Sequence, residues 1–243
     1  MNVPLGDRMK AYERMTVNEM DGYGPDTCII VRIDGKAFHT FTRHMEKPFD
    51  AALSAVMADT MVELVKEVQS CIYGYTQSDE ISLVLCKQSA KSEFYMAAKI
   101  QKLVSICASL ATAHFNDFFF TDFSTDEEGL AMSLAFFDAR CFTVPNFTEA
   151  NNYLRWRIFD AKTNGVNSIA HHMFSPAQLA SVNTEGRIKM INDAGGMRVE
   201  EFPSWTQFGY GYRKDLNKLE IPRFVLERNM IEEIMTAVRE SDV

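Results

Sequence analysis

The sequence lacks the features that mark membrane and secreted proteins. None of its apolar runs approaches the ~20 residues that a membrane-spanning helix needs. Its first residues, MNVPLGDRMKAYERM, lack the apolar core of a signal peptide. No internal repeat or low-complexity segment is apparent. We therefore expect a cytoplasmic protein that has no membrane partner.

Cysteines are few and are not arranged as metal ligands. The five thiols are scattered, odd in number and mostly set in apolar segments, without a C-x-x-C pair (Cys28, Cys71, Cys86, Cys107 and Cys141). This pattern predicts reduced thiols in the core. The adjacent His171 and His172 are not at the i, i+4 spacing of a zinc-binding helix, so we expect them to cap or pack.

Positive charge is in deficit as well. Lys and Arg number 25 against 33 Asp and Glu, which gives a net charge of −8. Phosphate binding needs local positive charge, but clustered Lys and Arg can supply it on an acidic protein, so net charge does not identify the partner. Apolar residues are plentiful, at 47% of 243 residues. They can form the core of one large domain, or of one domain with an appendage.

Strands and helices alternate in the predicted secondary structure. An apolar, β-branched run ends at Asp34-Gly35, which is typical of a strand followed by a turn. From Asp50, a good N-cap, apolar residues recur at helical spacing. The expected strands cover residues 27–33, 70–75, 81–85 and 134–144, and the expected helices cover residues 51–68 and 100–111. The connection over 76–80 is too short for a parallel crossover and therefore predicts a hairpin.

The order β-α-β-β-α-β predicts an α+β fold. It builds an antiparallel sheet with two helices on one face, the ferredoxin-like arrangement of polymerase palms, nucleotide cyclases and RNA-recognition modules. We assign residues 1–145 to this palm-like domain and residues 146–243 to an extension packed on it. The extension is predicted to be helical over 149–157, then irregular and glycine-rich, with a late hairpin around 208–213. Such a fold does not specify a function.

Two aspartates are expected to meet at one edge of this sheet. Asp34 ends the first strand, and Asp79 lies at the tip of the hairpin. Magnesium prefers carboxylate oxygens and substrate phosphates, so two aspartates and a backbone carbonyl suffice to hold it. Two such ions could activate an attacking hydroxyl and stabilise a leaving pyrophosphate. Taken singly, Asp-Gly is more often a plain turn and Ser-Asp-Glu a plain loop tip, and only their joint placement favours catalysis.

Neighbouring residues could complete a nucleotide site. Gly35 lets the backbone approach a phosphate, and the turn after it can point N–H groups at a triphosphate. Side-chain contacts are available from Lys36, His39 and Lys47. Glu80 should point to the side of the strand opposite Asp79, where it either supports the site or is solvated.

Several basic residues and one asparagine are candidates for contacts with RNA. A solvated face explains each candidate equally well. The candidates are Lys99, Lys102, Arg140, Arg155, Arg157, Lys162 and Asn164. We interpret Trp156 and Trp205 as packing residues.

Five ordered motifs resemble those of the tRNA-His guanylyltransferase family. They are RIDGKAFHTFTR, KPFD, GYTQSDEISLVL, FDARCFTVP and YLRWRIFDAKTN, spread over residues 29–167. A chance match of five motifs in order is improbable. The resemblance implies metal ligation by Asp34, the Gly35 carbonyl and Asp79, with Lys47 near the phosphates. Glu80, which follows Asp79 in the chain, is a further catalytic candidate that ranks below Asp79. The resemblance also implies a nucleotide lying along Asp34, Gly35, Lys36, Ala37, Phe38 and His39 and meeting Ser78 and Asp79.

The family reaction activates a tRNA 5′ phosphate with ATP and then lets the 3′ hydroxyl of GTP attack, so growth runs 3′ to 5′. The resemblance also implies two magnesium ions and a homotetramer. Enzymes strict for tRNA-His carry a His-Ile-Asn-Asn motif, and here the stretch reads Lys162-Thr163-Asn164-Gly165. The chain therefore resembles the broader branch of polymerases that extend truncated tRNA 5′ ends on a template, with GTP preferred.

Other functions stay open at this stage. They are a strict tRNA-His guanylyltransferase, a nucleotide cyclase or 5′–3′ polymerase on a similar palm, and a non-catalytic RNA-binding module. A cyclic or dinucleotide product made without RNA would favour the cyclase or 5′–3′ polymerase. An RNA-binding module would place aromatic residues on the sheet face and has no need of Asp34 or Asp79.

Overall fold

A six-stranded antiparallel sheet forms the centre of the molecule, with the order β4-β1-β3-β2-β5-β6. The computed structural model describes residues 3–14, 24–89, 91–123 and 133–241. The strands are β1 (Cys28–Gly35), β2 (Cys71–Gln77), β3 (Glu80–Cys86), β4 (Phe137–Val144), β5 (Tyr210–Arg213) and β6 (Lys218–Glu220). The first four strands have the ferredoxin-like order, so the predicted β-α-β-β-α-β palm is confirmed.

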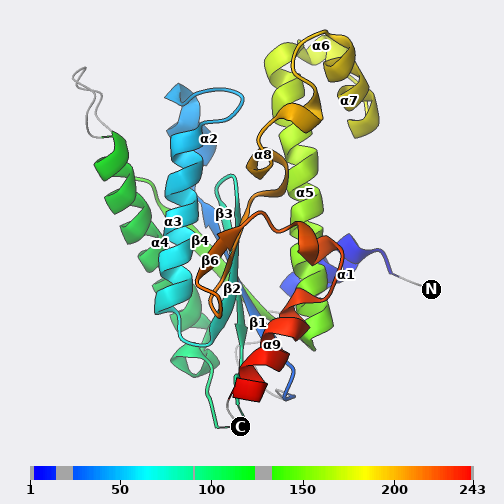
Figure 1. Ribbon diagram of the computed structural model, residues 1–243. Coiled ribbons are helices and arrows are strands. Elements are labelled where there is room, and N and C mark those ends of the chain that lie inside the picture. The colour runs from blue at the N-terminus through cyan, green and yellow to red at the C-terminus, as the bar shows by residue number, and fades with distance from the viewer. Residues whose placement is uncertain (1–2, 15–23, 90, 124–132, 242–243) are drawn as a thin grey trace.

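Helices cover both faces of the sheet (Figure 1). On one face, α3 (Ala51–Glu67) and α4 (Ile100–Phe123) pack together, as the sequence predicted. On the other face lies α5 (Phe147–Met173), together with α1 (Leu5–Arg14) and α9 (Met230–Ser241). Shorter helices complete the chain: α2 (Phe38–Phe41), η1 (Thr42–His44), η2 (Tyr95–Ala98), α6 (Pro176–Leu179), α7 (Thr184–Asp193), η3 (Val199–Glu201), α8 (Trp205–Phe208) and η4 (Arg223–Leu226).

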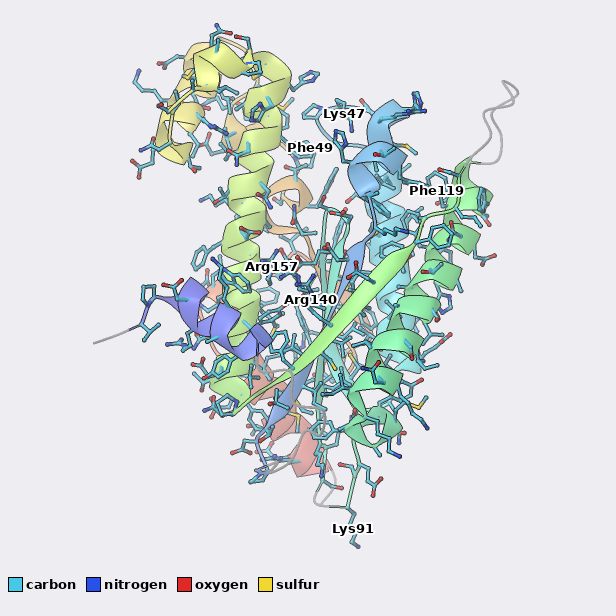
Figure 2. All side chains as sticks on the ribbon, turned by 180° about the vertical axis from the view of Figure 1, so that it is seen from behind. Lys47, Phe49, Lys91, Phe119, Arg140 and Arg157 are labelled. Atoms are coloured by element: carbon cyan, nitrogen blue, oxygen red, sulfur yellow. The ribbon has the colours of Figure 1, made fainter. Side chains whose placement is uncertain are left out.

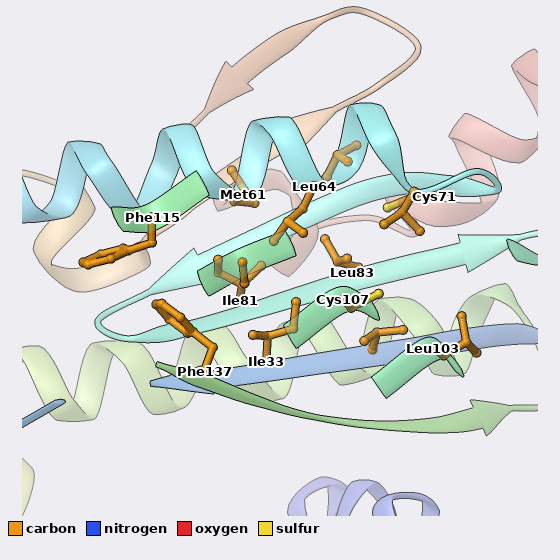
Figure 3. Close-up of a cluster of buried hydrophobic side chains, with 14 of the residues drawn as sticks. Ile33, Met61, Leu64, Cys71, Ile81, Leu83, Leu103, Cys107, Phe115 and Phe137 are labelled. Atoms are coloured by element: carbon orange, nitrogen blue, oxygen red, sulfur yellow. The ribbon is translucent and has the colours of Figure 1, made fainter. Parts of the chain in front are cut away.

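Burial on both faces explains why β1 is apolar nearly throughout. Alternate residues Ile29, Val31 and Ile33 belong to the core under α3 and α4. Figure 3 shows this core, where Ile33 and its neighbours on β3 face side chains of both helices. Cys28 and Ile30 point the other way, into a second core under α5 and α9. The sheet is therefore the middle layer of three.

Helix α3 begins where the sequence predicts. The Asp50 carboxylate accepts a hydrogen bond of 2.9 Å from the Leu53 N–H, so it caps the helix. The loop before Asp50 and the first turn of α3 form one side of the cavity described below.

Helix α5 is longer than expected, and the predicted change to irregular structure after Arg157 is wrong. The helix runs for 27 residues through Gly165 to Met173. A Cβ atom at Gly165 would lie 2.4 Å from the backbone oxygen of Thr206 in α8. The glycine is thus a close contact between two helices, and tertiary packing outweighs its low helix propensity.

The predicted late hairpin is confirmed, with its turn further along the chain. Strands β5 and β6 pair with each other, and β5 also pairs with β2. The hairpin therefore extends the palm sheet beyond β2 (Figure 1).

The cysteines and α4 test two sequence expectations. All five cysteines are buried and free, as predicted.

The expectation that no apolar run reaches spanning length is wrong for α4. Over Ile100–Asp122 this helix is long and apolar enough to cross a membrane by length and composition, and 33% of that window is buried. Core helices of globular domains meet the same criterion, and α4 packs against α3 and β4.

Candidate active site

The two aspartates converge at one edge of the sheet, as the sequence predicted. Gly35 at the end of β1 donates its N–H to the Asp79 carbonyl oxygen over 3.0 Å, which ties the β2–β3 turn to β1. Burial raises the pKa of the Asp79 carboxyl, and the charge of Asp34 raises it further. The two carboxylates are therefore close enough to repel each other.

Unusual backbone conformations flank this pair. Ala37 and Ser78 both adopt the left-handed region, each with φ of 55°. Such residues cost of the order of 1 kcal/mol and persist at sites that the surrounding structure over-determines. Gly35 is required for packing, because a Cβ atom there would lie 2.2 Å from the Phe38 ring.

The donor set suits magnesium better than zinc. Among the residues that the structure describes, no group of three or more His, Cys, Asp or Glu side chains could hold a metal. Asp34 and Asp79 form a like-charged pair of hard oxygen donors, which a divalent cation would stabilise. Because magnesium takes its remaining ligands from substrate phosphates and water, two carboxylates and the Gly35 carbonyl fit it.

A cavity of about 340 Å³ opens beside Asp79. The predicted residues that line it are Phe38, His39, Lys47, Ser78 and Asp79. The ammonium group of Lys47 donates a hydrogen bond to the Thr42 carbonyl at 3.0 Å. Figure 2 shows Lys47 and Phe49 at the same end of the molecule, between α2 and α5.

The predicted phosphate cradle is only partly available. Asp34, Gly35, Lys36 and Ala37 do not belong to the cavity lining. The N–H groups of Gly35 and Lys36 already donate to the carbonyl oxygens of Asp79 and Phe136. These two N–H groups therefore have partners within the fold, and the prediction that the turn can point N–H groups at a triphosphate rests on the residues after Lys36.

Glu80 is buried and ion-paired, so the solvated alternative for this residue is wrong. It pairs in register with Asp34 across the β1–β3 ladder. The carboxylate accepts bonds from Arg157 Nε at 2.6 Å and Arg157 Nη2 at 2.7 Å, and Arg32 Nη2 lies 2.8 Å away. Burial raises the pKa of Glu80, against the lowering effect of the two guanidinium groups. These pairs anchor the strand that follows Asp79.

Arg157 is not an RNA-contacting residue of a solvated face, contrary to the sequence expectation. Its side chain is 7% exposed, stacks over Trp156 and also pairs with Asp160 at 3.0 Å. A bidentate pair with Glu80 fixes it on the inner side of α5.

The other predicted RNA residues do not form one surface. Lys99 and Lys102 are exposed at the start of α4. The Tyr95 N–H, just before them, donates to Ser70 at the start of β2, which is the end of the sheet away from Asp79. Arg140, Lys162 and Asn164 are exposed and Arg155 is half-buried, and Figure 2 shows Arg140 between β4 and α5.

Sequence reasoning missed the far wall of the cavity. Gly165 and Ser168 of α5 line it, together with Trp205, Thr206 and Tyr210 from the C-terminal third. Arg32 was missed as well. The charged Arg32 within the apolar run TCIIVRI was an available signal, whereas the aromatic wall depends on how α8 packs on α5.

The family model for tRNA(His) guanylyltransferase matches residues 6–145, which is more than half of the chain. The chain belongs to this family. It is therefore an enzyme of the nucleotidyltransferase class. A protein of Acanthamoeba polyphaga mimivirus without assigned function is 32% identical over 238 residues, covering 90% of this chain and 80% of that protein. The tRNA(His) guanylyltransferase of Eremothecium gossypii is 32% identical over 168 residues, covering 68% of this chain and 69% of the enzyme.

Solved structures of tRNA(His) guanylyltransferase relatives share the fold. A bacterial tRNA(His) guanylyltransferase-like protein in complex with ATP has a TM-score of 0.81 and 28% identity, covering 96% of this chain and 99% of that one. A bacterial complex with GTP has a TM-score of 0.69 and 27% identity over the same shares. The similarity to these structures extends beyond residue 145, where the family model ends.

Proposed function

We propose that this enzyme is a magnesium-dependent 3′–5′ nucleotidyltransferase that adds nucleotides, GTP preferred, to the 5′ end of tRNA. The observation that carries the proposal is the meeting of Asp34 and Asp79 beside a cavity lined by Lys47 and Ser78. Membership of the family and the ATP and GTP complexes of bacterial relatives support the nucleotide substrates.

Each residue has a separate part in this proposal. Asp34, Asp79 and the Gly35 carbonyl would hold magnesium, which would polarise the phosphate under attack and lower the pKa of the attacking hydroxyl. Lys47 offers a positive charge at the cavity mouth, and Ser78 offers a hydroxyl and a tight turn. Glu80 and Arg157 are positioning residues, because they fix the strand behind Asp79 and leave no free carboxylate for the substrate.

We propose templated repair of truncated tRNA ends, with ATP activating a 5′ monophosphate, in place of strict addition to tRNA-His. The Lys162-Thr163-Asn164-Gly165 stretch supports this choice, because it keeps only Asn164 of the His-Ile-Asn-Asn motif. The close contact of Gly165 with α8 gives this departure a physical basis. Any residue with a Cβ atom, Asn included, would collide with the Thr206 carbonyl.

An extension assay tests the activity. The protein is incubated with magnesium, ATP, labelled GTP and a 5′-monophosphorylated tRNA shortened by one 5′ nucleotide opposite a template cytidine. Wild type should add one labelled nucleotide, Asp79→Ala should lose at least a hundredfold in rate, and Asp117→Ala on the exposed side of α4 should behave as wild type. No extension by wild type, or full extension by Asp79→Ala, would contradict the proposal.

Changing the template nucleotide separates the two forms of the activity. A templated enzyme should incorporate the complement of whichever base stands opposite, and a 5′-triphosphate end should need no ATP. Addition of guanosine regardless of the template would favour the strict tRNA-His enzyme.

We also propose a homotetramer that works in the cytoplasm. Family resemblance is the support for the assembly. Light scattering coupled to size-exclusion chromatography tests it, and a monomer or dimer at working concentration would contradict it.

A further inference from the structure

The wall of the cavity that faces the aspartate turn is aromatic. Trp205 and Tyr210 lie nearly parallel, with ring centroids 6.4 Å apart and an interplanar angle of 12°. Phe49, from the loop before α3, meets Trp205 edge to face at 5.9 Å. All three rings are half-buried and line the cavity, so apolar flat surface is presented to whatever enters it.

The structure holds this wall rigidly. The close approach of Gly165 sets the distance between α8 and α5, and the buried Gln207 amide donates to the Val199 carbonyl at 2.9 Å. On the other side, a Cβ atom at Gly209 would lie 2.3 Å from the Thr76 oxygen of β2. The wall is thus preformed against both the helix and the catalytic hairpin, and a ligand that stacks on it would not have to order it.

The aromatic wall and Asp79 face the same cavity. Tyr210 pairs in register with Thr76, which lies three residues before Asp79 along the hairpin. Asp79 and Ser78 line the cavity together with Trp205 and Tyr210. A molecule with phosphates at one end and a flat ring at the other can therefore reach both.

The polar atoms of the wall are available as well. Within the described parts of the chain, neither the Tyr210 hydroxyl nor the Trp205 indole N–H has a hydrogen-bond partner. Both side chains are half-buried and line the cavity, so these two groups can meet a ligand there. A ligand with hydrogen-bonding groups at the edge of its ring would supply them, which distinguishes a nucleobase from a plain apolar group.

We propose that Trp205, Tyr210 and Phe49 form a stacking site for a nucleobase, namely that of the nucleotide whose phosphates lie at Asp34 and Asp79. This inference rests on the proposed function. Through Trp205 and Tyr210 it gives the C-terminal third, which lies outside the matched family model, a part in substrate binding. Aromatic rings bind bases with little regard to sequence, because every base has a π face, so this site would add affinity to any templated nucleotide.

Tryptophan fluorescence tests the stacking directly. The chain has two tryptophans, and Trp156→Phe leaves Trp205 as the sole reporter. GTP with magnesium should quench its emission, whereas tripolyphosphate with magnesium, which has no base, should not. If only the tRNA end quenches, the base belongs to the RNA and the stacking site stands with that source. No quenching by either one overturns the proposal.

Calorimetry on variants gives a second readout. Trp205→Leu should weaken GTP binding about tenfold and leave tripolyphosphate binding unchanged, while Trp205→Phe should keep most of the affinity. Phe159→Leu, an exposed aromatic outside the cavity, serves as the control. Equal loss of GTP and tripolyphosphate affinity would make the wall merely structural and overturn the inference.

The two proposals fail in different ways. A wild-type protein that extends tRNA while Trp205→Leu binds GTP normally overturns the stacking site alone. A wild-type protein that neither binds GTP nor extends tRNA overturns the proposed function and the stacking site together.

Discussion

At the scale of single residues, the Glu80–Arg157 pair shows how a buried charge becomes part of a site. Removing a carboxylate from water is expensive, and the raised pKa of Glu80 reflects that cost. The bidentate bond from Arg157 and the contact with Arg32 offset it and also fix the geometry of the strand next to Asp79. The pair is therefore better explained by positioning than by a net gain in stability.

Breaking this pair should be costly. Arg157→Met leaves Glu80 with Arg32 as its remaining partner, and we expect a loss of about 3 kcal/mol in the free energy of unfolding, measured by urea denaturation. Adding Glu80→Gln should recover much of that stability but not the tRNA extension activity. Arg198→Met breaks an exposed 3.7 Å pair with Glu200 and should change stability negligibly. Similar losses in both arginine variants would contradict this explanation.

Gly35→Ala should damage the site through sterics. The new methyl group would lie 2.2 Å from the Phe38 ring, which packs against Phe115 and Phe137 in the core. We expect about 1–3 kcal/mol of destabilisation, seen as a lower urea midpoint, together with weaker magnesium-dependent GTP binding. Gly196→Ala has open space around it and is the matched control. An unchanged midpoint for Gly35→Ala would show that Phe38 moves aside freely.

At the scale of elements, α5 joins the site to the rest of the molecule. Its middle carries Arg157, its later turns carry Gly165 and Ser168, and its end supports a small core with α6 and α7. Because α8 packs so closely on α5, the position of the aromatic wall relative to the Asp79 turn is fixed.

Gly165→Ala should separate α8 from α5. The backbone of Thr206 cannot rotate away as a flexible side chain would, so we expect a fall in GTP affinity along with a stability loss of about 1–3 kcal/mol. Isothermal titration and urea unfolding measure the two effects. Thr163→Ala on the same helix should change neither by more than about 1 kcal/mol. If Gly165→Ala binds GTP as wild type does, the spacing of α5 and α8 is irrelevant to the cavity.

At the scale of the whole molecule, burial of the thiols should make the free energy of unfolding fall as the pH rises above 9. Burial raises the pKa of Cys71 and of Cys107 to about 12, and that of Cys141 to about 11, from 9.0. The unfolded chain therefore loses these protons first as pH rises. The contribution of these thiols to the unfolding free energy is therefore fully present below pH 9 and is lost between pH 9 and about 12.

Each of these thiols should add a slope of up to about 1.4 kcal/mol per pH unit to the unfolding free energy. Urea unfolding at several alkaline pH values measures the total slope. Cys71→Ala should reduce it, whatever the absolute stability of the variant. An unchanged slope in Cys71→Ala would mean that this thiol ionises equally in both states.

Much of the palm and part of the site could be predicted from the sequence because those signals are local. The strand ending at Asp34, the capped helix after Asp50 and the hairpin tip at Asp79 each depend on neighbours in the chain. The meeting of the two aspartates followed from strand order alone. The family motifs then added a reaction that no hydrophobic pattern could specify.

The tertiary structure decided the rest, because those features depend on contacts between distant residues. Gly165 lies in a stretch that the sequence predicts to be irregular, and only the Thr206 backbone packed against it explains a glycine in the middle of α5. Arg157 is predicted to be a solvated charge until Glu80 is found 2.6 Å away. Trp205 became a wall of the cavity only when α8 packed on α5. Local propensity sets which elements form, whereas burial and contact across the fold determine what each side chain faces.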